Sequence, residues 1–153
     1  MRMKLANALS QRADLMKRIE QLGYRLNMNA KVQEGEKPAE DPKALLKELE
    51  KDTAALEDLI ARINLTNSLT KTKDGKSLTE YIAMRDVLLK KISIYRNFID
   101  EASYLVSRDT HSEIKIESTV NVKTLRTELD RMEKEAREIN ETIQEMNWTA
   151  DLL

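Results

Sequence analysis

The sequence predicts an all-α protein: an up-down-up-down four-helix bundle of antiparallel, coiled-coil-like helices with short β-like connections. Of 153 residues only three are glycine and two proline, while 35% are charged, a composition typical of long helices. Four stretches repeat apolar residues at spacings of three and four. Connections of about ten residues cannot lead the chain back along a helix of about 38 Å, so successive helices should be antiparallel. A splayed helical hairpin that closes only in an oligomer is the alternative.

The first two helices are expected over residues 3–29 and 43–67. Asp41 before Pro42 is a typical N-cap with proline at the first helical position of the second helix. Residues 1–31 hold seven basic and two acidic side chains, whereas residues 32–58 hold four basic and nine acidic ones, so the two helices should attract each other. The apolar seam of the first helix is Leu5, Ala8, Arg12, Leu15, Ile19, Leu22 and Leu26. The seam of the second is Leu45, Leu49, Asp52, Leu56, Leu59, Ile63 and Thr66.

The other two helices are expected over residues 78–107 and 122–147. Ser77 to Glu80 ("SLTE") reads as a capping box, and Asn121 can cap the last helix. The third seam is Leu78, Tyr81, Arg85, Leu88, Ile92, Tyr95, Ile99, Ala102 and Val106. The fourth, without a polar interruption, is Val122, Leu125, Leu129, Met132, Ala136, Ile139, Ile143 and Met146. Between helices, Asp74-Gly75 suits a type I′ hairpin turn, and "EIKI" at 113–116 alternates like a short strand.

Composition limits the classes of function. The length suits a single domain over residues 1–153, and the absence of cysteine excludes a disulfide scaffold and thiol catalysis. No apolar run approaches the roughly 20 residues of a membrane span, and the N-terminus lacks signal-peptide features, so a cytoplasmic protein is expected. The basic first helix lacks interleaved aromatic residues, which argues against a nucleic-acid partner. No cofactor is expected, because no phosphate-binding glycine loop is present.

A metal site has one weak set of candidates, the side chains of Asp109, His111 and Glu113. A spacing of two in an extended segment places these side chains on one side. A transition-metal site usually has more than one histidine or cysteine ligand, and His111 is the only histidine. A solvated loop is therefore the preferred interpretation.

Polar residues are expected to converge at one end of the bundle, because antiparallel packing brings the end of the second helix beside the ends of the others. The candidate residues are Arg12, Asn64, Asn67, Arg85, Glu141, Asn147 and Trp148. In the structural interpretation they fix the helix register and the oligomeric state, a known use of buried polar groups. In the functional interpretation they line a pocket for a small anion or an assembly surface. The structural interpretation is preferred, since no nucleophile or reaction can be identified.

Several short segments carry a resemblance to a known family. They are "RADL" at 12–15, "AKVQEGEKPAEDP" at 30–42, "INLTN" at 63–67, "SEIKI" at 112–116 and "NWT" at 147–149. Through them the chain resembles an uncharacterised family of small bacterial helical proteins, some of which carry the label septicolysin. That label implies a membrane-active cytolysin. The resemblance assigns no catalytic or binding residue.

These observations together predict a homo-oligomeric helical interaction or scaffold protein rather than an enzyme. A narrow heptad-type seam buries well only against other helices, which favours assembly of several copies. Two alternatives remain open at this point: a septicolysin-like cytolysin, and an enzyme or a small-anion-binding protein that uses the polar end of the bundle.

Overall fold

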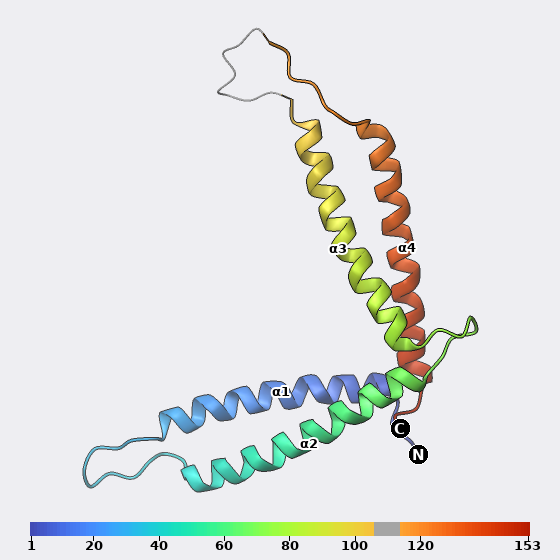
Figure 1. The fold of residues 1–153 in the computed structure, drawn as a ribbon. Helices are drawn as coiled ribbons and strands as arrows, with labels where there is room; N and C mark the ends of the chain where they lie inside the picture. Colours follow the sequence, from blue (N-terminus) through green and yellow to red (C-terminus); the bar gives the residue numbers. More distant parts are fainter. Residues whose placement is uncertain (106–113) are drawn as a thin grey trace. The chain divides into compact units, whose positions relative to one another are not determined.

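The computed structural model describes residues 1–105 and 114–153, and these residues form four helices (Figure 1). The helices are α1 (Leu5–Met28), α2 (Pro42–Leu69), α3 (Leu78–Ser103) and α4 (Val122–Thr149). No strand occurs in these two ranges. The predicted all-α class with four long helices is confirmed, and the helices pack in antiparallel pairs. The chain divides into two compact units, Met1–Ser77 with Met146–Leu153, and Leu78–Glu145, each described here by itself.

The first unit is built on an antiparallel hairpin of α1 and α2. Arg25, near the end of α1, pairs with Glu40 just before α2, and Arg18 faces Asp52 further along. The buried side chains of the hairpin all belong to the predicted seams: Leu5, Ala8, Leu22, Leu45, Asp52, Leu59, Ile63 and Thr66. Burial of each large aliphatic side chain contributes about 1.5–3 kcal/mol, so the apolar seam residues hold the two helices together.

The connection between α1 and α2 is organised by polar contacts at its two ends. The Asn29 side chain donates to the Arg25 carbonyl oxygen at 2.7 Å and accepts the Glu40 backbone N–H at 3.0 Å. The Arg25 guanidinium donates to both Glu40 carboxylate oxygens, at 2.5 and 3.0 Å. This hydrogen-bonded guanidinium lowers the pKa of the Glu40 carboxyl below its ordinary value. The Asp41 side chain accepts from the Lys43 N–H at 3.1 Å, as predicted for an N-cap.

The Glu40 contact should make stability depend on pH. A carboxyl whose pKa is lowered by folding stabilises the protein above its unfolded pKa, and this contribution is lost as the pH falls through the folded pKa. We therefore expect Glu40→Gln to unfold at lower urea concentration than the wild type at pH 7, and the difference to shrink progressively as the pH falls through the lowered pKa of Glu40. Glu36→Gln, in the same loop, is the matched control and should match the wild type at pH 7. An equal effect of both substitutions would contradict a specific role of Glu40.

The connection between α2 and α3 is a tight hairpin, although not of the predicted turn type. Lys71 and Ser77 form an isolated antiparallel bridge, and the Thr72 N–H donates to the Lys76 carbonyl at 2.9 Å. Only Gly75 in this turn has a positive φ, 84°, whereas a type I′ turn requires positive φ at Asp74 as well. The Gly75 N–H bonds back to the Thr72 carbonyl at 3.0 Å. The type I′ prediction was wrong: the loop has three residues and ends on a left-handed glycine, which spares Asp74 that conformation.

The second unit is an antiparallel hairpin of α3 and α4. Arg96 pairs with Glu133 at 2.6 Å, and Arg126 donates to the Ser103 hydroxyl at 3.3 Å. A small cluster joins the helices: Ile92, Met132 and Ala136 are buried, with Leu88, Tyr95 and Leu129 partly buried against them. The Asn121 side chain accepts from the Thr124 N–H at 3.1 Å and caps α4, as predicted.

Two expectations around the α3–α4 connection need correction. Helix α3 ends at Ser103, before the expected end at 107. There the Ser103 hydroxyl donates to the Ile99 carbonyl at 2.6 Å, a back-bond that competes with helix continuation. Residues 114–116 of "EIKI" form no strand, and residue 113 lies outside the described ranges.

Candidate functional site

The seven residues predicted for the polar end are divided between the two units. Arg12, Asn64, Asn67, Asn147 and Trp148 belong to the first unit, and Arg85 and Glu141 belong to the second. That all seven form one site therefore remains a prediction.

Thr66 explains why the apolar seam of α2 ends on polar residues. Its side chain is fully buried, and its hydroxyl donates to the Arg62 carbonyl at 2.8 Å. The same hydroxyl accepts the backbone N–H of Leu153 at 3.0 Å. Thr66 thus attaches the last residues of the chain to the end of α2.

Residues 150–153, which we name the C-terminal clasp, join the start of α1 to the end of α2. The Leu5 N–H donates to the Ala150 carbonyl at 2.9 Å, and the Leu152 N–H donates to the Met3 carbonyl at 2.8 Å. Leu152 is buried, with 3% of its surface exposed. The Arg62 guanidinium donates to the Leu153 carbonyl at 2.8 Å. Backbone pairing and one buried leucine therefore hold the clasp in place.

An ion pair flanks this backbone pairing. The Lys4 ammonium lies 2.7 Å from the Asp151 carboxylate, and the two residues form an isolated antiparallel bridge. The hydrogen bond from Lys4 and then its charge lower the pKa of the Asp151 carboxyl. Both side chains are more than a third exposed, so the pair orients the clasp more than it stabilises it.

The other candidates of the first unit differ in burial. Asn147 is buried, whereas Asn64 is exposed and Arg12 and Asn67 are half-buried. Trp148 is 64% exposed, so its indole lies at the surface. This distribution fits a structural end of the hairpin, because Asn147 is the only buried residue of these five candidates and the nearby polar contacts to the clasp come from Thr66.

Asp52 is a buried carboxylate in the seam between α1 and α2. It is 5% exposed, and its Oδ2 atom has no hydrogen-bond partner. The nearest cation is Arg18, whose Nε lies 3.9 Å from Oδ2 and whose side chain is half-exposed. A buried carboxylate with so few partners lowers the stability of the fold. Its presence in the seam suits a role other than packing, such as fixing the helix register.

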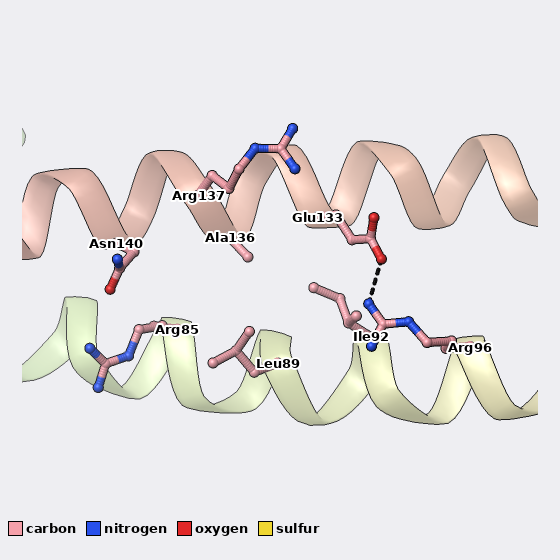
Figure 2. A pocket seen from close by; sticks show the side chains of 8 residues that line it. All are labelled: Arg85, Leu89, Ile92, Arg96, Glu133, Ala136, Arg137 and Asn140. Carbon is pink, nitrogen blue, oxygen red and sulfur yellow. Dashed lines mark hydrogen bonds and ion pairs between the residues drawn. The ribbon is translucent and has the colours of Figure 1, made fainter.

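An arginine-rimmed groove lies between α3 and α4 (Figure 2). It has a volume of about 540 Å³, and its floor is apolar. It is lined by Arg85, Leu89, Ile92, Arg96, Glu133, Ala136, Arg137 and Asn140. Figure 2 shows Arg85 and Asn140 at one end and the Arg96–Glu133 ion pair at the other. Of the candidates predicted from the sequence, only Arg85 lines this groove.

A second, mostly apolar groove of about 420 Å³ lies between the same helices. It is lined by Ala83, Met84, Val87, Leu88, Lys91, Glu135 and Ile139. Val87 also belongs to a stripe of exposed apolar side chains on α3, which we name the α3 stripe. Its members are Val87, Ile94 and Phe98, which are 69%, 62% and 47% exposed respectively. The spacings of seven and four place these three side chains on one face of the helix. The stripe was missed in the sequence because the stronger seam of α3 concealed it.

The predicted metal candidates Asp109, His111 and Glu113 lie outside the described residues. Within residues 1–105 and 114–153, no group of three or more histidine, cysteine, aspartate or glutamate side chains is placed to hold a metal ion.

Comparison with known proteins adds a family and a structural relative. A solved structure described as a functionally unknown conserved protein from Corynebacterium diphtheriae is 39% identical. The match covers 100% of both chains with a TM-score of 0.90. A search of curated proteins finds no significant match. The profile of a family of unknown function, DUF6847, matches residues 12–152, and the chain therefore belongs to that family.

Proposed function

We propose that this protein is a homo-oligomeric helical interaction protein of the cytoplasm, in which the α3 stripe of one copy packs against a second copy. The observation that supports this is the exposure of Val87, Ile94 and Phe98 on one face of α3. Contiguous apolar patches of this kind on a surface are typical of interaction sites. The stripe continues into the apolar groove, so a second helix pair would find both a ridge and a hollow.

The thin core of the second unit gives a physical reason for assembly. Seven apolar side chains are buried among its described residues, and three of them form its central cluster: Leu78, Ile99, Ile139 and Ile143, with Ile92, Met132 and Ala136 in the cluster. Two hairpins that pack face to face form a four-helix arrangement with a much larger shared core. Assembly would therefore supply apolar burial that one hairpin cannot achieve alone.

Charge at the apolar groove favours a second copy as the occupant. The groove carries one cation, Lys91 on α3, and one anion, Glu135 on α4, which also pairs with Arg131 of its own helix at 3.4 Å. A two-fold axis places the same patch on both sides of an interface, so Lys91 of each copy can meet Glu135 of the other. A surface with both signs is complementary to itself, whereas a surface of one sign would repel its own copy.

We expect Ile94→Glu to dissociate the oligomer, because it buries two uncompensated carboxylates at the two-fold interface. Sedimentation velocity or light scattering at micromolar concentration measures the mass, and far-UV circular dichroism checks that the helices remain. Ser93→Glu is the matched control: it places the same charge on the neighbouring residue of α3, about 100° away around the helix, and should leave the mass unchanged. A wild type that is monomeric at every concentration would refute the proposal, as would an Ile94→Glu protein of unchanged mass.

The resemblance to proteins labelled septicolysin gives a second use for the same stripe, contact with a lipid surface. No helix in the described part of the chain has the length and apolar character needed to cross a membrane. Dye release from cholesterol-containing liposomes distinguishes the two uses. Lytic activity would be favoured over self-association if the wild type stayed monomeric and released the dye, and if Ile94→Glu abolished this release.

A further inference from the structure

The arginine-rimmed groove is separate from the α3 stripe and is not used by the proposed self-association. Its floor is formed by Leu89, Ile92 and Ala136. The rim carries three arginines and one carboxylate, Glu133, which pairs with Arg96. An apolar floor below a rim with excess positive charge suits a ligand that is apolar on one side and acidic at its edges.

The three guanidinium groups differ in how far they are already neutralised. Arg96 is engaged by Glu133 across the groove at 2.6 Å. Arg85 is held by packing, with 28% of its side chain exposed, and its Nε lies 3.2 Å from the carboxylate of the adjacent Asp86. Arg137 makes no ion pair with any residue of the described ranges. Arg137 therefore has its whole guanidinium available for a carboxylate, whereas Arg85, which donates through Nε to Asp86, offers its two terminal nitrogens.

The length of the groove decides between a small anion and an extended ligand. Arg85 and Arg96 are separated by about 16 Å along α3, at 1.5 Å per residue. Figure 2 shows Arg137 on α4 between the level of Arg85 and that of Ile92, and the Arg96–Glu133 pair at the far end of the groove. A phosphate or a small carboxylate cannot span the distance between Arg85 and Arg96, so it would leave much of the groove unused.

We infer that the arginine-rimmed groove binds an amphipathic helix of a partner protein that carries acidic residues on both sides of an apolar stripe. The stripe packs on the half-exposed Leu89, above the buried Ile92 and Ala136, as a third helix packs into the groove between two others. Acidic residues on one edge meet Arg85, and those on the other edge meet Arg137 and the amide of Asn140. The interaction would be separate from self-association, because it uses the other groove of the same hairpin.

The probe is a fluorescein-labelled synthetic peptide of about five helical turns, with leucine at helical spacing and glutamate on both flanks. Two further peptides serve as controls: a scrambled sequence of the same composition, and one with lysine in place of every glutamate. Fluorescence anisotropy measures binding to the full-length protein. We expect saturable binding of the glutamate peptide and no saturable binding of the scrambled peptide.

Variants of the rim test which residues are responsible. Arg85→Gln with Arg137→Gln should weaken binding of the glutamate peptide about tenfold, the loss expected for two partly exposed ion pairs. Arg131→Gln is the matched control, because Arg131 lies on α4 but is occupied by Glu128 and Glu135. The Arg131→Gln protein should bind the glutamate peptide with the same affinity as the wild type. Arg85→Glu with Arg137→Glu should shift the preference to the lysine peptide.

The remaining outcomes overturn the inference. Equal binding of the glutamate and scrambled peptides would show that charge alone attracts them. An affinity unaffected by the arginine substitutions would place the peptide elsewhere on the protein. Inorganic phosphate at low millimolar concentration could displace the glutamate peptide while Leu89→Ser leaves peptide binding unchanged. That pair of results would instead identify a small-anion site.

Discussion

Replacing Leu152 by alanine should lower the free energy of unfolding by about 2–4 kcal/mol, measured by urea denaturation. Leu152 is almost fully buried, and its backbone N–H also pairs with the Met3 carbonyl. The substitution keeps that backbone bond and removes only the side chain, so the loss measures the packing of the clasp. A large-to-small change at a closed site leaves a cavity that the surroundings fill only in part.

Leu153→Ala is the matched control for this prediction. Leu153 is 45% exposed, and its contacts to Thr66 and Arg62 come from backbone atoms that alanine retains. Its effect should stay within about 0.5 kcal/mol, as for most surface substitutions. If both variants matched the wild type in stability, the clasp would not hold the hairpin together.

Asp52→Leu should raise the free energy of unfolding by about 1–3 kcal/mol. The Asp52 carboxylate is desolvated, its Oδ2 has no hydrogen bond, and the Arg18 guanidinium at 3.9 Å compensates it only weakly. Leucine would continue the seam with a side chain of suitable shape. Because the Arg18 side chain is half-exposed, it can turn to solvent and is not left as a buried charge.

Asp58→Leu provides the comparison, since Asp58 is an exposed acid of the same helix that pairs with Arg62 at 3.9 Å. We expect no measurable gain there. A loss of stability in Asp52→Leu would show that the carboxylate is better satisfied than its geometry indicates. If Asp52 instead fixes helix register, the more stable variant should show several masses or several sets of amide NMR signals.

Local and periodic features of this fold could be predicted from the sequence. The seams identified the buried faces of α1 and α2, and the caps at Asp41 and Asn121 depend only on residues two or three positions away. The α2–α3 turn type could not be predicted, because it depends on a single φ angle at Asp74. The α3 stripe could have been found by counting a second set of apolar positions, Val87, Ile94 and Phe98.

The clasp could not be predicted for a different reason. Residues 150–153 follow the last helical repeat and are too few to show periodicity. Their partners are Met3, Leu5 and Thr66, and nothing in the local sequence indicates contacts at such separations. The candidate residues of the polar end, such as Asn64 and Asn147, were therefore identified by residue type alone. The contacts that hold the clasp are made by backbone atoms and by the Thr66 hydroxyl.

The clasp also has a consequence for the order of folding during synthesis. Lys4 and Asp151 are 147 positions apart, and closing a chain segment of that length costs roughly 4 kcal/mol of entropy, in addition to a constant. The α1–α2 hairpin depends on contacts much nearer in sequence, so it can form while the ribosome is still translating the later helices. Until residues 150–153 emerge, the Leu5 N–H bonds to water, and so does the acceptor side of the Thr66 hydroxyl, which keeps its bond to the Arg62 carbonyl. Every nascent chain therefore passes through an interval in which this hairpin is formed but its open end is unsealed.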